Sequence, residues 1–395
     1  MGISKIKLLH HNLSVIGLIL VFLLICVRML PADDITITQA ANVAKQTGKR
    51  HCLSEAPKEP RFTIPADRVW PLKTGEGEVC LWAGDKLAAA SITIDDNWAP
   101  DHDWWMELGR KTGFRFTWFV ITERVGSDFG GKWEDFRKLR NLGHDIQSHS
   151  VSHLRGQLDI ESEYRDSQAA IEKAMSGKKV LCLAYPGGEA PVKNDPDVAV
   201  KYYIGARGTV GAANTANAIN YMMTNSATIN KEWVDKILDK EQLKRGKYGS
   251  YRAWLCSHYH GVNYGKTDEE KKTSAAKVAE NIMYLKSREA DIWVGLFREV
   301  VLYGQERDTA KLKITANSDN EIRFFLSDDM DDAIFDYPLT VKLRLTDAWN
   351  TAEATQGGKP VEIKLVTHEN AKFALVRAIP DRGEVEIVQT AGVLK

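Results

Sequence analysis

The amino-acid sequence predicts an α/β protein with two domains: a parallel sheet that closes, or nearly closes, into a barrel, followed by a small antiparallel β domain. The chain has 395 residues, enough for a large enzymatic domain and a smaller companion. Short apolar runs alternate with helical patterns over residues 86–307, as in a barrel of parallel strands. From residue 308 the helical pattern stops and alternating apolar and polar residues replace it, which is typical of antiparallel strands.

The first domain is expected to hold seven strands and five helices. The strands are predicted at 88–94, 114–121, 144–148, 180–185, 203–206, 251–257 and 292–296. The helices are predicted at 103–112, 133–142, 160–175, 269–287 and 299–305. Gly143 directly follows the second of these helices and is a typical helix stop.

The second domain, residues 308–395, is expected to be a β-sandwich. Its strands are predicted at 311–315, 321–326, 340–345, 360–366, 371–378 and 385–388. Turn-forming stretches separate them at 318–320, 357–358 and 381–383. No aromatic pattern marks a binding face, so a structural role that covers the barrel is favoured over carbohydrate binding.

Residues 33–85 read as a linker and N-terminal extension. The segment contains Pro57, Pro60, Pro65 and Pro71, and no long periodic pattern. It is therefore expected to wrap onto the barrel domain that follows it in the sequence.

The charge balance argues against nucleic acid as a partner. Lys plus Arg and Asp plus Glu both number 53, hydrophobic residues make up 44% and charged residues 27% of the chain. This is the composition of a folded globular protein with no basic excess. A neutral substrate fits better than a polyanion.

The sequence of residues 1–32 predicts that the protein is exported. Lys5 and Lys7 precede an apolar run at 15–27 that Arg28 ends, which matches a secretory signal with a cut after Ala32. The alternative is an uncleaved N-terminal membrane anchor, because residues 8–30 could be stretched across a bilayer. The expected location is the periplasm, the cell surface or the medium.

Four cysteines follow this segment. In an exported chain they allow three pairing schemes, and a Cys52–Cys80 disulfide is the favoured one. Cys182 and Cys256 lie in apolar runs and are expected to be buried strand residues.

Asp95 and Asp96 end the apolar run at 88–94, at the edge where parallel sheets hold their sites. Side chains of adjacent strand residues point to opposite sides, so one carboxylate could bind a metal while the other acts as a base. The alternative is a capping pair before the next helix.

His149 and His153 follow another strand, with the four-residue spacing that would place two imidazoles on one side of a helical turn. Two imidazoles and one carboxylate form a three-ligand site that keeps a position open for water. Ser150 stands where a zincin would carry Glu, so the general base must come from elsewhere, and Asp95 is available.

These residues carry a family resemblance. Thr93-Ile94-Asp95-Asp96-Asn97 and His149-Ser150-Val151-Ser152-His153 resemble the first two motifs of the polysaccharide deacetylases, the NodB-homology domain of carbohydrate esterase family 4. The resemblance covers residues 86–307. It implies a distorted (β/α) barrel, a divalent ion, with zinc favoured and cobalt as the alternative, and an acetylated polysaccharide or oligosaccharide as substrate.

By position, the resemblance implies Asp95 as the catalytic base and Asp96, His149 and His153 as metal ligands. Asn97 replaces the usual Gly, and Asn tolerates a left-handed turn.

Ala184-Tyr185-Pro186-Gly187-Gly188 looks like the third motif, which would place Tyr185 and Gly187 at the substrate and the oxyanion. The usual Arg of this motif is absent, and Ala184 stands in its place. Arg207 could supply the cation that orients Asp95, or could form an ion pair of purely structural value.

The last motif is an apolar strand that ends in His, and residues 253–261 offer two candidates. His260 is favoured as the general acid, because the pair His260-Gly261 is similar to that of many family members. His258 is the alternative.

The predicted function is therefore metal-dependent removal of N- or O-linked acetyl groups from an extracytoplasmic polysaccharide or amino-sugar glycan. Two alternatives remain open. One is a carbohydrate-binding protein on a catalytically decayed barrel, which the missing Arg suggests. The other is a related metal-dependent amidase on a non-sugar substrate.

Overall fold

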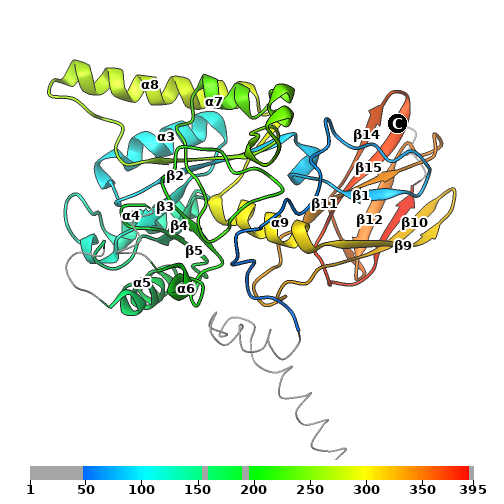
Figure 1. Ribbon diagram of the computed structural model, residues 1–395, viewed down its shortest axis with the longest axis horizontal. Helices are drawn as coiled ribbons and strands as arrows, with labels where there is room; N and C mark the ends of the chain where they lie inside the picture. The colour runs from blue at the N-terminus through cyan, green and yellow to red at the C-terminus, as the bar shows by residue number, and fades with distance from the viewer. Residues whose placement is uncertain (1–47, 154–158, 189–194, 391–395) are drawn as a thin grey trace, which may run out of the picture.

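The computed structural model describes residues 48–153, 159–188 and 195–390. Two halves lie side by side in Figure 1, an α/β half with its helices outside the sheet and an all-β half. The predicted signal or anchor at 1–32 lies outside the described residues. Within them, no helix is long and apolar enough to cross a membrane.

The α/β half is built on one parallel sheet of seven strands, which confirms the predicted fold class. The strand order is β6-β5-β4-β3-β2-β7, and β8 also pairs with β2. The strands are β2 (Ala88–Ile94), β3 (Thr117–Val120), β4 (Asp145–Ser148), β5 (Cys182–Ala184), β6 (Gly205–Arg207), β7 (Trp254–Tyr259) and β8 (Ile292–Val294). All seven residues of β2 are buried, as expected for a strand with both faces covered.

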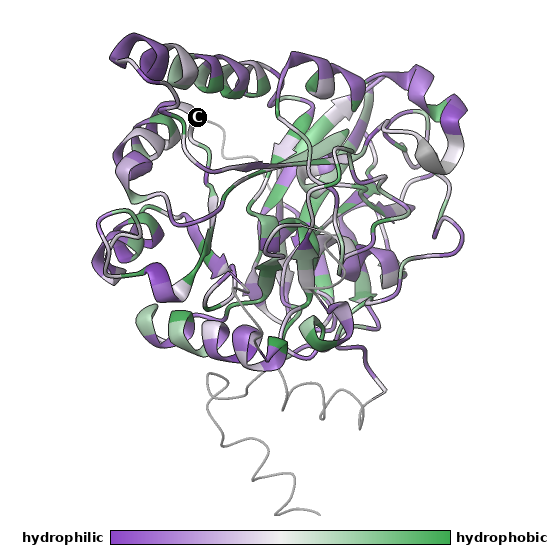
Figure 2. Cartoon of the chain, turned by 60° about the vertical axis from the view of Figure 1, so that its left-hand side comes forward, coloured by the Kyte–Doolittle hydropathy of each residue, from purple (hydrophilic) through white to green (hydrophobic). Residues whose placement is uncertain are grey.

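Helices cover the outside of this sheet. They are α3 (His102–Thr112), α4 (Trp133–Asn141), α5 (Ile160–Ala174), α6 (Pro196–Ala199), α7 (Lys231–Lys236), α8 (Asp268–Ser287) and α9 (Phe297–Thr309), with short 3-10 turns η1 (Ala83–Asp85), η2 (Ala99–Asp101), η3 (Thr122–Arg124) and η4 (Lys240–Tyr248). Local sequence sets their ends: Thr267 and Glu270 form a capping box at the start of α8, and Gly113 ends α3 with a φ of 75°. Hydrophilic residues colour the outer faces of the helices in Figure 2, and the strands between them are largely hydrophobic.

An irregular segment, rather than a strand, spans the gap between β6 and β7. On one side Thr224 donates to Ala206 O at 2.9 Å, and on the other Ala227 donates to Cys256 O at 2.8 Å. The backbone groups at the two sheet edges are thereby satisfied. The barrel is distorted because this part of its wall is loop.

The all-β half contains two antiparallel sheets, which confirms the predicted sandwich-like domain. One sheet has the order β1-β11-β15-β14 and the other β13-β12-β16-β10-β9. Their strands are β1 (Gly77–Val79), β9 (Lys311–Asn317), β10 (Glu321–Ser327), β11 (Leu339–Arg344), β12 (Ala352–Gln356), β13 (Lys359–Pro360), β14 (Ile363–His368), β15 (Ala371–Ala378) and β16 (Val385–Gln389). Strands β1 and β12 were not predicted, and the expected strand at 360–366 is divided between β13 and β14.

The N-terminal extension packs on both halves. Strand β1 pairs with β11 of the sandwich. On the barrel side, Arg252 donates to the carbonyl of Asp67 at 2.7 Å. The extension is therefore a structural part of both domains and more than a linker wrapped on the barrel.

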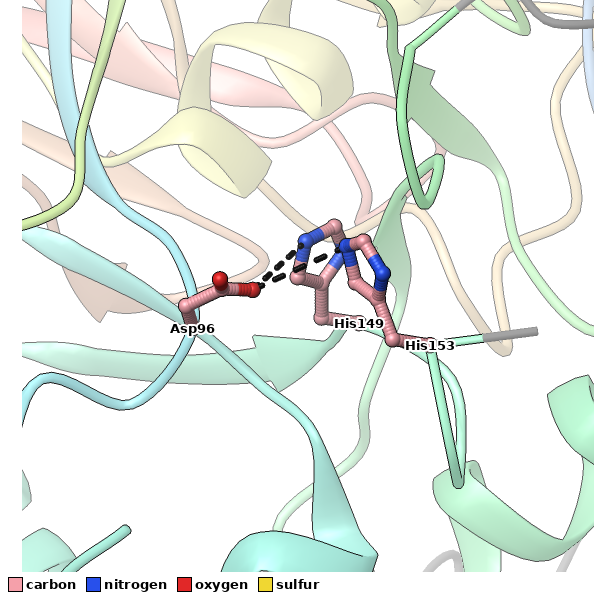
Figure 3. A group of neighbouring side chains, drawn as sticks. All are labelled: Asp96, His149 and His153. Carbon is pink, nitrogen blue, oxygen red and sulfur yellow. Dashed lines mark ion pairs between the residues drawn. The ribbon is translucent and has the colours of Figure 1, made fainter. Parts of the chain in front are cut away.

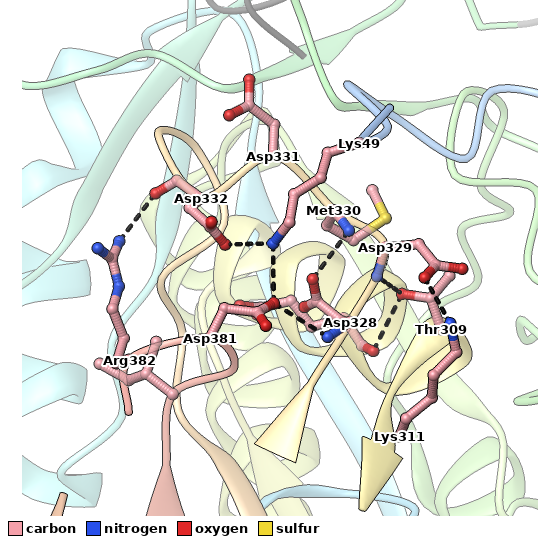
Figure 4. Close-up of polar contacts among 12 residues, drawn as sticks. Lys49, Thr309, Lys311, Asp328, Asp329, Met330, Asp331, Asp332, Asp381 and Arg382 are labelled. Carbon is pink, nitrogen blue, oxygen red and sulfur yellow. Dashed lines mark hydrogen bonds and ion pairs between the residues drawn. The ribbon is translucent and has the colours of Figure 1, made fainter. Parts of the chain in front are cut away.

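Lys49 joins the start of the extension to the sandwich (Figure 4). Its Nζ lies 2.7 Å from Asp332 Oδ1 and 2.8 Å from Asp381 Oδ2. Asp328, which is buried, donates its backbone N–H to the same Asp381 carboxylate. The Lys49 ammonium thus lies among carboxylates that would otherwise repel one another.

Helix α9 lies between the two halves (Figure 1). Its residues are almost all buried, and Phe297, Val301 and Tyr303 belong to one core that includes residues of the barrel and of the sandwich. The expected domain boundary between residues 307 and 308 falls within the last turn of this helix.

The cysteine prediction was wrong. Cys52, Cys80, Cys182 and Cys256 are all free thiols. The Cys52 thiol instead donates to Ile204 O at 3.3 Å. Cys80, directly after β1, is buried, and Tyr303 Oη of α9 donates to its carbonyl. Cys182 and Cys256 are buried in strands, as expected.

Candidate active site

The chain leaves β2 through three successive left-handed residues. Asp96, Asn97 and Trp98 have φ values of 60°, 66° and 42°, a conformation that costs L-residues about 1–2 kcal/mol each. The Asn97 side chain helps to hold it, because Oδ1 accepts from Ile121 N at 2.8 Å and Nδ2 donates to Gly130 O at 3.0 Å. The expected left-handed turn at Asn97 is confirmed, and this turn separates the Asp95 and Asp96 side chains.

Asp96, His149 and His153 come together in one group (Figure 3). Asp96 Oδ1 lies 3.5 Å from His149 Nε2 and 3.7 Å from His153 Nε2. The two imidazole rings stand nearly perpendicular, with their centroids 4.8 Å apart. The carboxyl ends of β2 and β4 therefore deliver the three expected ligands to one point.

The chemistry of these three donors fits a divalent cation. His149 Nδ1 lies 2.7 Å from Ala184 O, so Nδ1 carries the proton and the lone pair of Nε2 faces Asp96. Burial lowers the pKa of His149 to about 4, although the nearby Asp95 and Asp96 oppose this shift, so the ring is neutral at pH 7. Asp96 Oδ1 is buried and has no hydrogen-bond partner in the described part of the chain. Oδ2 of the same carboxylate is 3.2 Å from Arg124.

The loop that carries the two histidines is not the helical turn expected from their spacing. Ser150 and His153 have φ values of 65° and 64°, and the loop is held by a carboxylate from α5. Glu163 accepts from Val151 N at 2.9 Å and from Ser152 N at 2.8 Å. Sequence reasoning missed Glu163 and Arg124, since nothing in their local sequence relates them to these motifs.

Asp95 forms a buried ion pair with Arg207, as the sequence suggested. Arg207 Nη2 donates to Asp95 Oδ2, and the two residues are 0% and 3% exposed. In the sheet, Arg207 of β6 lies directly opposite Ala184 of β5. The cation missing from the third motif is thus supplied from the neighbouring strand.

The ion pair with Arg207 keeps Asp95 ionised. Burial alone would raise the pKa of this carboxyl, but Arg207 and the neighbouring histidines outweigh burial and hold the pKa below its usual value. Asp95 Oδ1 is buried without a hydrogen-bond partner among the described residues. Asp95 is thus an ionised carboxylate with one oxygen not used by the fold.

His258 and His260, the two candidate general acids, lie near Asp95, and both contribute to the electrostatic field that lowers the pKa of Asp95. Their ring centroids are 5.9 Å apart. His258 Nδ1 is hydrogen-bonded to Ser226 Oγ. His260 lies beyond the end of β7, beside Trp98 at a centroid distance of 6.1 Å. His260 as the acid stays a prediction, with His258 as the alternative.

Tyr185 is buried, and both of its hydrogen-bond donors are used within the fold. Its ring is 1% exposed, its hydroxyl donates to Met222 O at 2.9 Å, and its N–H donates to Arg207 O at 2.9 Å. Neither donor is available to a substrate. Gly187 is exposed and has a φ of 71°, so it remains the candidate from the third motif.

Comparison with known proteins finds similarity both to the barrel domain and to most of the chain. A family model described as polysaccharide deacetylase matches residues 85–201. A protein named gellan lyase, from a Bacillus species, is 39% identical over 356 residues, a match that covers 84% of this chain. The chain spans only 14% of the length of that protein.

Similar solved structures include deacetylases and an inactive relative. A polysaccharide deacetylase from Bacillus cereus is 20% identical with a TM-score of 0.32, over 35% of this chain and 46% of that one. A putative polysaccharide deacetylase from Mycobacterium smegmatis is 13% identical with a TM-score of 0.38, over 56% and 91%. A pseudoenzyme of the CE4 family from Bacillus anthracis is 15% identical with a TM-score of 0.33, over 54% and 66%. Residues 85–201, in the barrel domain of this chain, match the polysaccharide deacetylase family.

Proposed function

We propose that this protein is a metal-dependent hydrolase that removes N- or O-linked acetyl groups from a polysaccharide or amino-sugar glycan. The observation that carries the proposal is the group Asp96, His149 and His153 beside the buried pair of Asp95 and Arg207. A decayed site would have no reason to keep an ionised carboxylate beside three metal donors that converge from the ends of two strands.

Asp96, His149 and His153 would hold the ion. One carboxylate and two imidazoles suit zinc, with cobalt as a substitute. When bound, such an ion would polarise an acetyl carbonyl and make water more acidic.

The remaining roles belong to side chains and backbone groups around this point. Asp95, kept ionised by Arg207, accepts a proton from the attacking water. His260 donates a proton to the leaving amine or alcohol, with His258 as the alternative donor. The Gly187 N–H donates to the acetyl oxygen as negative charge develops there. Acetate and the deacetylated sugar are the products.

Acetate release is the direct test. The full chain is stripped with a chelator, reloaded with zinc or cobalt, and incubated with chitin oligomers, peptidoglycan, acetylated xylan and gellan. We expect release from at least one glycan, loss of release after chelation, and loss in Asp95→Asn. Asp319→Asn, a surface substitution in the sandwich, serves as the matched control.

Each alternative predicts a different outcome. Glycan binding without acetate release in any reloaded sample would favour the binding protein on a decayed barrel. Release of acetate only from small non-sugar amides would favour the amidase. Either result would contradict the proposed deacetylase.

Gellan is included because the Bacillus relative is named a gellan lyase. A lyase cleaves the glycan chain itself, whereas a deacetylase leaves chain length unchanged. Size-exclusion chromatography of the treated gellan separates the two activities, and we expect acetate without chain shortening.

We also propose that the protein acts outside the cytoplasm. The support is the basic and apolar sequence at 1–32. Cell fractionation of the producing organism tests it, and recovery of the protein in the cytoplasmic fraction alone would contradict it.

A further inference from the structure

Three aromatic side chains gather beside the candidate active site. Trp98 packs edge-on against Phe129 at a centroid distance of 4.7 Å, and against Tyr264 at 5.9 Å. We call Trp98, Phe129 and Tyr264 the aromatic wall. Phe129 is 38% exposed and Tyr264 is 51% exposed, so this cluster is not simply part of the core.

The wall is continuous with the proposed reaction centre. Trp98 stands in the same left-handed turn as Asp96. On its other side the indole lies 6.1 Å, centroid to centroid, from the ring of His260. A ligand held against the wall would therefore extend directly from the group that is proposed to protonate the leaving atom.

Three loops hold the wall in place through specific contacts. Ala99 donates to Phe129 O at 3.0 Å, which joins the Trp98 turn to the Phe129 loop. The buried Asp101 accepts from Val262 N at 2.7 Å, which joins the same turn to the Tyr264 loop. The wall is thus preorganised, although its outer faces remain exposed.

Gly261 is required by this arrangement. A Cβ at Gly261 would lie 1.9 Å from Trp98 Nε1, so the indole packs directly on the glycine backbone. The N–H of Gly261 donates to Tyr264 Oη at 3.1 Å, which folds the Tyr264 ring back toward Trp98. The His260-Gly261 pair therefore has a packing reason: the glycine leaves space for the wall.

Exposed aromatic rings beside a polar site offer flat faces of the kind that stack on sugar rings, and clustered exposed apolar groups mark binding grooves. A structural role alone does not explain why two of the three rings face solvent. We propose that Trp98, Phe129 and Tyr264 form a sugar-binding subsite for the pyranose ring next to the acetylated one. The proposal rests on the proposed function and deepens it: the substrate is an oligosaccharide or polysaccharide and not a single acetylated sugar.

The test uses the outer rings, because Trp98 has a left-handed backbone and its replacement could disturb the metal ligands. The variants are Phe129→Ala, Tyr264→Ala, their double variant, and Tyr264→Phe, which keeps the ring. Phe325→Ala is the matched control, since Phe325 is an aromatic residue 45% exposed in the sandwich. Chemical denaturation first shows that each variant is folded.

Two readouts are compared for each variant: calorimetric binding of acetylated oligosaccharides, and KM for an oligosaccharide against KM for the acetylated monosaccharide. In the double variant we expect oligosaccharide affinity to fall about 10-fold, with a smaller effect on the monosaccharide. Tyr264→Phe should retain more affinity than Tyr264→Ala, and Phe325→Ala should match the wild type.

The subsite and the catalytic proposal fail in different ways. If the folded double variant binds every oligosaccharide as the wild type does, or if the wild type binds none, the subsite is overturned. If binding depends on Tyr264 but no acetate is released from any substrate, the subsite stands and the deacetylase proposal falls.

Discussion

Two side-chain clusters, one in the barrel and one in the sandwich, have donor atoms close enough to hold a metal, yet only one of them contains a lysine. Asp96, His149 and His153 form one, and Asp328, Asp332 and Asp381 form the other, each with its donor atoms within 4.8 Å of one another. In the second, Lys49 already bridges two carboxylates (Figure 4). In the first, Asp96 Oδ1 and both imidazole nitrogens converge without a lysine between them.

A third group follows the pattern of the second. Glu78, Cys80 and Asp85 also lie within this distance, but the buried Lys342 has its Nζ 2.8 Å from Asp85 and 3.4 Å from Glu78. Proximity of acidic residues is therefore a poor guide to a metal site. The better guides are an uncompensated carboxylate oxygen and a histidine whose other nitrogen is fixed by a hydrogen bond.

The largest effect is expected from the first cluster. His149→Ala removes a direct ligand, and since loss of an outer-sphere partner alone costs about 10- to 100-fold in metal affinity or activity, we expect losses at or above the upper end. Zinc content after dialysis and acetate release measure the effect. His368→Ala, in the sandwich, should behave as the wild type. Unchanged zinc content in His149→Ala would contradict the comparison.

The next largest effect is expected at Lys342, which is 0% exposed. Lys342→Met removes the nearest positive charge from Asp85 and Glu78, and breaking a buried pair in this way costs about 3 kcal/mol of the free energy of unfolding. Urea denaturation gives the value, with the exposed Lys364→Met as control. A loss below about 1 kcal/mol would show that the cluster is not held by this lysine.

A smaller effect concerns pH. Burial raises the pKa of Asp328 to about 7, above its value in the unfolded chain. Between these two pKa values the folded state therefore keeps a proton that the unfolded chain has released. The resulting contribution to the free energy of unfolding is fully present below about pH 4 and is lost as the pH rises to about 7.

Asp328→Asn should remove that part of the pH dependence. Unfolding free energies at pH 5 and pH 8 should differ less in the variant than in the wild type, while Asn can still accept from Met330 N. Glu78, whose pKa burial also raises to about 7, contributes in the same direction and should remain. An identical pH profile in the variant would rule out Asp328 as a source.

The smallest effect is expected at Lys49, whose side chain is 24% exposed. Water screens this ion pair, so Lys49→Met should cost about 1 kcal/mol or less of the unfolding free energy and leave acetate release unchanged. Comparison of Lys49→Met with Lys342→Met tests whether burial determines how much each lysine stabilises its acidic cluster. A larger loss than at Lys342 would reverse that order.

Much of the fold was predictable because it depends on local pattern. Strand β2 was predicted with its observed bounds, and α3, α5 and α8 within one residue at each end, because apolar period and capping residues act over a few positions. Strand β1 was not, since its three residues become a strand only by pairing with β11, more than 250 residues away in sequence. The four free thiols show the same limit: cysteine spacing does not give distance in space.

The site divides in a similar way. Asp95, Asp96, His149 and His153 follow strand ends, so the parallel sheet alone brings them to one edge. Arg207 could be proposed from the sequence, but its ion pair with Asp95 and its register opposite Ala184 are seen only in the structure. The burial of Tyr185 was not predictable, because a strand-end residue can point into the core as easily as toward the site. The left-handed residues at Ser150 and His153 depend on Glu163 of α5, a contact that no spacing rule contains.

Helix α9 has a consequence for the ancestry of the chain. Because one core runs from the barrel through this helix into the sandwich, neither half could be exchanged for an unrelated module without exposing a large apolar surface. A match to the Bacillus protein that covers 84% of this chain must include both halves. We therefore expect barrel and sandwich to occur together in related chains, because a chain with only one of them would expose this core to water.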